Sequence, residues 1–455
     1  MTSKAVVGLS LSLAIATTAV MRRDVAGWEP VQDDAALVAR ARAIHERVLT
    51  LDTHNDIDPD QFTASCNYTM RLTTQVNLPK MRDGGLDVSF MIVYVGQGPL
   101  TPQGYEDAYR QAVAKFDAVH RLTEQIAPRE IGLALTPADV RSIAASGRKV
   151  AVIGVENGYP IGLDIRRVKE FYDRGGRYLS LAHNGHSQLA DSNTGEQDGR
   201  WLYGGLSPLG KQVIAELNRL GVMIDVSHPS KGAMMQAVAL SKAPVIASHS
   251  AARALANVSR NMDDEMLMAL KQNGGVIQTV AFSSYIKADP PQRSPALTAL
   301  RREFGLAAVT QNRERTSAGC PIEGAGAAGR SRTTDPSAAV AALSAERRAE
   351  YARRLAEIDS KWPAAPRATV KDFVDHIDYL VRLIGIDHVG ISSDFDGGGG
   401  IEGWNSAAEA FNVTLELVRR GYSEQDISRL WSGNLIRVWE QVEQVAKGIQ
   451  AGTIK

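Results

Sequence analysis

The sequence predicts an α/β protein of the (β/α)8, TIM-type barrel class, with one insertion after the seventh strand. Eight short apolar runs of strand length alternate with helical patterns along the 455 residues. Runs of this kind with helices between them form a parallel sheet that helices cover on its outer face. Five of the runs also end in residues that bind metals, and chemistry at strand C-termini is typical of barrel enzymes.

The strands are expected where β-branched and aromatic residues gather. In chain order they are residues 48–53, 86–95, 150–155, 178–182, 222–227, 245–248, 275–282 and 388–393. Helices are expected between them, several beginning at a Ser, Thr or Asp cap. They are residues 104–127, 165–173, 207–220, 231–241, 263–272 and 369–383.

One interval, residues 287–367, interrupts this alternation. It contains a Gly, Ala, Ser and Arg-rich tract at 319–337 and a charged, Ala-rich helix pattern at 338–361. We interpret it as an insertion on the active-site face, which could form a lid or part of the rim of the active site. For the Gly-Ala tract itself, we expect a solvated, partly disordered segment instead. Residues 22–455 are expected to form a single catalytic domain.

Composition excludes two classes of partner. The chain has 51 basic and 51 acidic residues, so no net field attracts nucleic acid or an anionic membrane surface. A hydrophobic content of 44% is that of a folded, enzyme-sized protein.

The N-terminus predicts export to the periplasm or the medium. Lys4 precedes an apolar stretch at residues 5–20 that carries small residues suited to cleavage, so residues 1–21 are interpreted as a cleaved signal peptide. An uncleaved anchor is the alternative, and no other segment is apolar for long enough to span a membrane. In an oxidising compartment Cys66 and Cys320 could form a disulfide, or they could be unrelated loop thiols.

Five residues at four strand ends have the chemistry of metal ligands. His54 and Asp56 are two apart and therefore project from the same face of the first strand. Glu156, His228 and His249 follow three other strands. Three imidazoles and two carboxylates exceed the needs of one zinc ion with an open position, and they suit two ions sharing a bridging carboxylate. Such a centre predicts hydrolysis by a bridging hydroxide.

A single histidine at a strand end is more often a structural residue than a ligand. Here four of the nine histidines fall at the ends of four different predicted strands, which favours a common site: His54, His183, His228 and His249. The other five are expected to be surface, helix or loop residues: His45, His120, His186, His376 and His388.

Several separate segments, in the same order, resemble the signature segments of the renal (membrane) dipeptidase family, peptidase family M19. They are Leu51-Asp52-Thr53-His54-Asn55-Asp56, Gly154-Val155-Glu156-Asn157-Gly158, Asp225-Val226-Ser227-His228, Ser248-His249-Ser250, Ser259-Arg260-Asn261-Met262-Asp263-Asp264 and Ser393-Asp394-Phe395-Asp396-Gly397. The resemblance extends from about His54 to Trp439, with the insertion as its main gap. These relatives are zinc peptidases with metallo-dependent hydrolase barrels.

The resemblance implies the same five ligands that the residues indicate. His54, Asp56 and Glu156 would hold one zinc ion, and Glu156, His228 and His249 the other, with Glu156 bridging. It also implies a homodimer. Cobalt or manganese could occupy the same geometry.

The resemblance further implies four residues that contact substrate. His183 would contact the scissile carbonyl or its oxyanion, and Arg260 would bind the dipeptide carboxylate, with Tyr285 nearby. Asp394 would bind the free amine and pass a proton to the leaving nitrogen. Three of these residues also have a structural alternative. Arg260 could form a salt bridge to Asp263 or Asp264, and Tyr285 could pack under the insertion. Asp394 could cap the turn at residues 397–400, although its neighbour Asp396 is better suited to that role.

The predicted function is therefore zinc-dependent hydrolysis of free dipeptides, including those with a D-residue at the C-terminal position. One alternative is a related barrel amidohydrolase acting on N-acyl amino acids, lactones or β-lactams. The other is a secreted binding protein with a non-catalytic metal site.

Overall fold

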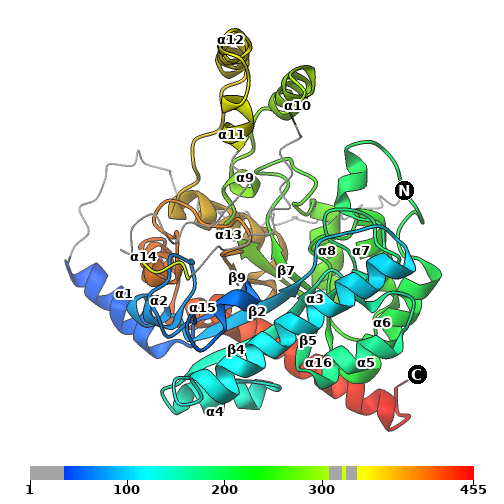
Figure 1. Cartoon of the computed structure of the whole chain (residues 1–455). Coiled ribbons are helices and arrows are strands. Elements are labelled where there is room, and N and C mark those ends of the chain that lie inside the picture. Colours follow the sequence, from blue (N-terminus) through cyan, green and yellow to red (C-terminus); the bar gives the residue numbers. More distant parts are fainter. Residues whose placement is uncertain (1–34, 307–319, 324–335, 455) are drawn as a thin grey trace, which may run out of the picture.

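The computed structural model describes residues 35–306, 320–323 and 336–454, and the expected signal peptide at 1–21 lies outside them. Helices surround a central parallel sheet (Figure 1). The neighbouring strands are, in order, β1 (Leu51–Asp56), β2 (Val88–Tyr94), β4 (Lys149–Glu156), β5 (Gly176–Ser180), β6 (Met223–Asp225), β7 (Ile246–Ser250), β8 (Val276–Val280) and β9 (Val389–Ser392). These are the eight strands that the sequence predicts, and the α/β barrel class is confirmed.

Contacts between β1 and β9 close the barrel. Asn55 forms a parallel bridge with Phe395, and the buried Asp52 carboxylate accepts a 2.9 Å hydrogen bond from the backbone N–H of Ser393. A ninth strand, β3 (Ile131–Leu133), pairs only with β4 and lies off this path. Its three residues are too few to give a period-2 signal, which is why the sequence did not reveal it.

The helices lie between and around the strands. Their bounds are α1 (Ala35–Arg47), α2 (Leu78–Gly84), α3 (Pro102–His120), α4 (Pro137–Ala145), α5 (Arg166–Asp173), α6 (Pro208–Leu220), α7 (Lys231–Leu240), α8 (Asp264–Asn273), α9 (Ser283–Ile286), α10 (Arg293–Glu303), α11 (Pro336–Ala341), α12 (Ala345–Lys361), α13 (Val370–Ile384), α14 (Phe411–Arg419), α15 (Glu424–Ser428) and α16 (Asn434–Gln450). The expected caps are present: Ser207, Asp263 and Thr369 each accept a hydrogen bond from a backbone N–H of the first turn.

Helix α16 covers the N-terminal end of the barrel. Its buried Leu435 and Trp439 pack in one apolar cluster with inward-facing strand residues such as Phe90 of β2, whose ring centre lies 6.3 Å from that of Trp439. Because apolar side chains fill this end, polar chemistry is confined to the opposite end, where the strands finish.

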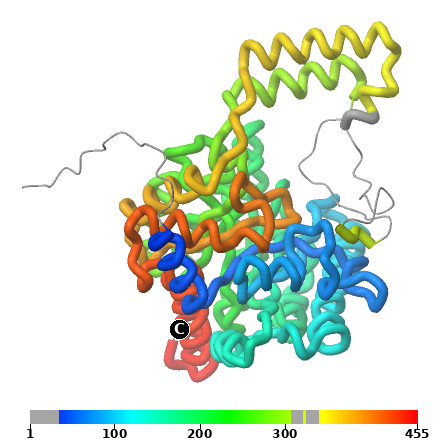
Figure 2. The backbone as a smooth tube through the Cα atoms, turned by 90° about the vertical axis from the view of Figure 1, so that its left-hand side faces the viewer, coloured from blue at the N-terminus to red at the C-terminus, as the bar shows by residue number. Residues whose placement is uncertain are grey.

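Part of the insertion forms a helical hairpin. Helices α10 and α12 pair and project away from the barrel (Figure 2). They bury a small core of their own, built on Leu300, Phe304 and Tyr351. The expected helix at 338–361 is present but interrupted after Ala341, and most of the Gly-Ala tract lies outside the described residues.

A disulfide fastens the insertion to the barrel. Cys66, in the loop between β1 and α2, is bonded to Cys320, which is 254 positions away. Next to this bond, the backbone N–H of Thr73 donates to the carbonyl of Pro321 (2.6 Å), and Lys80 pairs with Glu323 (2.7 Å). The pairing that the sequence left open is therefore present.

We expect Cys66→Ser to lower the free energy of unfolding by roughly 2–4 kcal/mol, because the bond restricts a very long loop in the unfolded chain. Urea denaturation of the oxidised wild type, the reduced wild type and the variant measures this. The reduced wild type is the matched control and should resemble the variant. Equal midpoints for all three would contradict the expectation.

Within the described residues, no helix combines the length and the apolar character needed to cross a bilayer.

Candidate metal centre

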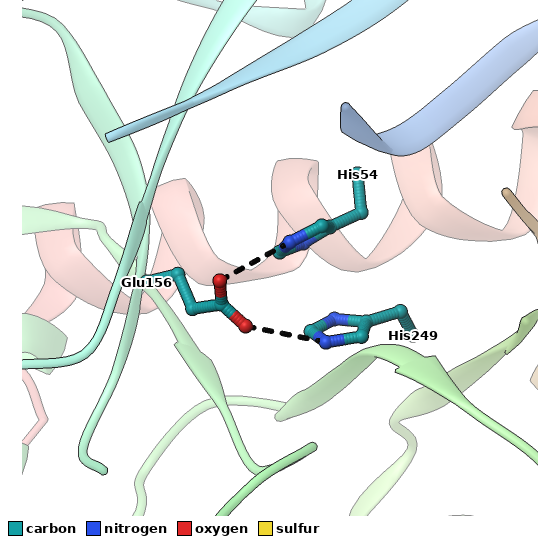
Figure 3. Close-up of side chains that lie close together, drawn as sticks. All are labelled: His54, Glu156 and His249. Carbon is teal, nitrogen blue, oxygen red and sulfur yellow. Dashed lines mark ion pairs between the residues drawn. The ribbon is translucent and has the colours of Figure 1, made fainter. Parts of the chain in front are cut away.

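The five expected ligands meet at the C-terminal ends of the barrel strands. His54 Nε2 lies 3.4 Å from Glu156 Oε2, while His228 Nε2 and His249 Nε2 lie 3.0 and 3.3 Å from Oε1 of the same carboxylate. Figure 3 shows the neighbouring rings of His54 and His249, each turned toward a different oxygen of Glu156. One buried carboxylate therefore faces two sets of imidazole nitrogens, as a bridging ligand would.

Asp56, the fifth expected ligand, and His183 lie in the same cluster. Asp56 Oδ2 lies 3.9 Å from His54 Nε2, and His183 Nε2 lies 3.7 Å from Glu156 Oε1. Three triples have ligand atoms within 4.8 Å of one another: His54, Glu156 and His249; Glu156, His183 and His228; and His54, Asp56 and Asp394. The triples share members, so the seven residues form one continuous group around Glu156.

Several buried atoms of this group have no conventional hydrogen-bond partner. His54 Nε2, Asp56 Oδ1 and Glu156 Oε1 make no hydrogen bond within the described residues. Buried polar atoms are otherwise almost always satisfied, so a missing partner calls for an explanation. Imidazole and carboxylate groups are the ligands of zinc and similar divalent ions. The residues present therefore fit a divalent metal centre.

Hydrogen bonds on the far side of two imidazoles orient them toward the centre. The Tyr178 hydroxyl donates to the carbonyl of Thr53 (3.3 Å) and lies 2.8 Å from His54 Nδ1, so it accepts the Nδ1 proton. Ser248 Oγ lies 2.8 Å from His249 Nδ1 and donates to the Asp225 carboxylate. In both residues Nε2 is therefore the nitrogen turned toward the centre, where its lone pair would bind a metal.

Sequence reasoning missed Tyr178, Ser248 and Asp225. A signal existed for Ser248, which directly precedes His249 in the chain. Tyr178 reaches across the barrel interior, where a Cβ at Gly154 of β4 would collide with its ring. That requirement for glycine is not visible before the two strands are placed side by side.

The protein groups alone set distinct charge states for the imidazoles. Burial would lower the pKa of His54, but the Glu156 carboxylate outweighs it and raises this pKa to about 9. Burial lowers the pKa of His183 to about 4, and it also lowers the pKa values of His228 and His249. The last three are therefore neutral at neutral pH, whereas His54 must release a proton when it binds a metal.

A guanidinium is fixed beside the cluster. Arg260 is buried, and its two terminal nitrogens donate to the carbonyls of Ser227 and His249, the latter at 3.1 Å. Its central carbon lies 5.2 Å from the ring centre of Tyr285, which stacks on Phe282. Arg260 and Tyr285 are thus brought together next to the imidazoles.

The alternative salt bridge for Arg260 is not formed within the described part of the chain. Asp263 instead pairs with Lys231 (2.7 Å) and caps α8, and Asp264 accepts a hydrogen bond from Tyr379.

Asp394 follows β9 and is 7% exposed. Burial raises its pKa well above the usual value, and the neighbouring Asp56 and Glu156 carboxylates raise it further. A buried carboxyl group with a raised pKa is a candidate for proton transfer during a reaction. The Asp396 carboxylate accepts hydrogen bonds from the backbone N–H groups of Gln75 and Val76, in the loop between β1 and α2.

The remaining histidines are bonded elsewhere. Their partners are Thr414 and Gly84 for His45, Glu124 and Arg174 for His120, Ser192 and Asp191 for His186, Ala252 and Ile286 for His376, and Gly275 for His388. None of the five belongs to the metal-ligand triples found among the described residues.

Comparisons with known proteins agree with this geometry. Residues 38–453 match the family model described as membrane dipeptidase (peptidase family M19). The dipeptidase aclJ of Aspergillus oryzae is 28% identical over 416 residues, which are 89% of this chain and 80% of that protein. The crystal structure of the probable dipeptidase PvdM from Pseudomonas aeruginosa is 35% identical, covers 90% of this chain and 99% of its own, and superposes with a TM-score of 0.72.

A metallopeptidase from Rhodobacter sphaeroides, solved with a phosphinate mimic of the dipeptide L-Ala-D-Ala, shares the fold. It is 21% identical, covers 87% of this chain and 99% of its own, and has a TM-score of 0.61.

Proposed function

Because the chain belongs to the membrane dipeptidase family, peptidase family M19, we propose that it hydrolyses free dipeptides with the help of two zinc ions. The observation that carries the proposal is the buried Glu156 carboxylate, whose Oε2 faces His54 Nε2 while its Oε1 faces His228 and His249 Nε2. His54 and Asp56 would hold one ion with Glu156, and His228 and His249 would hold the other. When bound, the ions would polarise the scissile carbonyl and make hydroxide available at neutral pH.

The protein's own residues would align the dipeptide and move its protons. Arg260 would bind the C-terminal carboxylate, with Tyr285 beside it, and Asp394 would bind the free amine. His183, neutral at working pH, would donate a hydrogen bond to the developing oxyanion. Asp394 would accept the proton of the attacking water and deliver it to the leaving nitrogen. Because both ends of the substrate are anchored, longer peptides should be poor substrates.

A substrate panel tests the proposal. We expect the chain from residue 22 onward, with zinc, to cleave L-Ala-L-Ala and L-Ala-D-Ala but not N-acetyl-Ala-Ala or Ala-Ala-Ala. Chelation should abolish turnover, and added zinc should restore it. Equal cleavage of the N-acetylated substrate would favour the broader amidohydrolase. Absence of turnover with zinc bound would favour the binding protein.

We expect Arg260→Lys to raise KM for dipeptides by about tenfold to a hundredfold with a smaller change in kcat, because an ammonium cannot replace the planar fork toward a carboxylate. Steady-state kinetics measure the split. A dipeptide amide, which lacks the carboxylate, is the matched control and should be an equally poor substrate for both proteins. An unchanged KM for the free dipeptide would show that Arg260 does not hold the carboxylate.

We also propose that the protein is exported to the periplasm or the medium. The N-terminal pattern at residues 1–21 supports this. The Cys66–Cys320 disulfide supports it as well, because such bonds persist in oxidising compartments. The homodimer that the family resemblance implies remains a prediction.

A further inference from the structure

We propose that Gln75 is a positioning residue for the reaction, because it fixes the turn that carries Asp394. This turn, residues 394–400, is called the Asp394 turn below. The inference rests on the proposed function, in which Asp394 holds the substrate amine and transfers a proton. It concerns a residue from a different part of the chain, in the loop between β1 and α2.

The Asp394 turn has a backbone that needs support. Asp394 and Asp396 have φ angles of 59° and 62°, in the left-handed region that non-glycine residues seldom adopt. Gly397 lies against the Asp394 and Asp56 carboxylates, where a Cβ would collide with both. The position of the Asp394 carboxylate therefore depends on the shape of the turn.

Gln75 holds this turn through both its side chain and its backbone. Its Oε1 accepts from the N–H of Asp396 (2.8 Å), and its Nε2 donates to the carbonyls of Gly399 and Asn405 (both 2.9 Å). Its backbone N–H donates to the Asp396 carboxylate at 3.0 and 3.1 Å. The side chain thus satisfies backbone groups at two points of the turn, and Asp396 holds Gln75 in return.

The loop that carries Gln75 is itself anchored. Cys66 binds it to Cys320, and Leu72 forms a bridge with Ile322. At the other end, the backbone N–H of Asp56 donates to the carbonyl of Phe395 within the turn (2.9 Å). Gln75 therefore fixes the Asp394 turn relative to the end of β1, which supplies His54 and Asp56. Because these two residues would bind a metal, fixing the turn would also fix Asp394 relative to the metals.

A double-mutant cycle tests the inference. We expect Gln75→Ala to lower kcat for L-Ala-L-Ala by about tenfold to a hundredfold, with zinc content unchanged. In the Asp394→Asn background, Gln75→Ala should cause no further loss, since residues that act through one another are not additive. A purely structural role would not produce this dependence.

Two more variants complete the experiment. Gln236→Ala is the matched control, because Gln236 also bonds backbone groups of a loop, at Leu206 and Gly204 between β5 and α6, and these bonds do not involve the Asp394 turn. It should keep the wild-type kcat. Gln75→Glu keeps the Oε1 acceptor but replaces the Nε2 donor, and it takes the place of Gln75→Ala in the cycle if that variant does not fold. It too should lower kcat without an additive effect.

The possible results distinguish failure of the proposed function from failure of the inference about Gln75. If the wild type cleaves no dipeptide, the proposed function fails and the inference falls with it. If the wild type is active but Asp394→Asn retains full activity, the role proposed for Asp394 fails, and the inference that depends on that role is overturned while the dipeptidase function stands. If Asp394→Asn is impaired while both Gln75 variants keep the wild-type kcat, only the inference is overturned. Multiplicative losses in the double variant, or loss of zinc from the Gln75 variants, would overturn it as well.

Discussion

Replacing Glu156 with glutamine is expected to reduce dipeptide hydrolysis by roughly 10³-fold or more and to lower the zinc content of the purified protein. The carboxylate supplies one oxygen toward His54 and the other toward His228 and His249. An amide has one acceptor oxygen and no negative charge, and its NH2 group would face an imidazole nitrogen. This one substitution therefore lowers the affinity for metal at both positions. No other ligand variant is expected to affect both.

Elemental analysis of zinc per chain and steady-state rates measure this effect. Glu424→Gln is the matched control, because that carboxylate lies at the surface and pairs only with Arg47 within the described residues. It should keep both the zinc content and the rate. A Glu156→Gln protein that retains two zinc ions would contradict a bridging role for this carboxylate.

Replacing Asp394 with asparagine is expected to lower kcat by roughly 10²–10⁴-fold while the zinc content stays unchanged. Asparagine tolerates the left-handed backbone at this position, where φ is 59°, so the turn should persist. The amide can neither accept the proton of the attacking water nor pair with a charged amine. The variant should therefore also lose its preference for free over N-acetylated dipeptides.

The ratio of rates for Ala-Ala and N-acetyl-Ala-Ala measures that preference directly. Asp60→Asn, an exposed aspartate in the loop after β1, serves as the control and should leave the ratio as in the wild type. A large fall in kcat with an unchanged ratio would assign proton transfer to Asp394 but not amine binding. Loss of zinc would instead show that Asp394 is a metal ligand.

The sequence predicted the barrel because its eight main strands are buried on both faces and leave continuous apolar runs. It also predicted which residues meet around Glu156, since side chains at parallel strand ends share one edge of the sheet. Strand β3 was not predicted because three residues are too few to show an alternating pattern. The break between α11 and α12 was not predicted because the Ala-rich helix pattern continues across it.

Contacts between residues that are far apart in the sequence could not be predicted from a sequence pattern. The support of His54 by Tyr178 crosses the barrel over a separation of 124 residues, and Gln75 meets Asp396 across 321. The pairing of Cys66 with Cys320 stayed open for the same reason, because sequence separation carries no information about distance in space. Such residues are identified only when neighbouring elements are seen together.

The C-terminal helix α16 has a consequence for the order of folding. Its Leu435 and Trp439 complete the apolar interior of the barrel, and β1 closes on β9 through Asp52 and Ser393, which are 341 positions apart. The barrel core therefore cannot be completed until α16 has been synthesised. Folding of the barrel should accordingly be slow and late, and a chain truncated before α16 should expose apolar strand ends and aggregate.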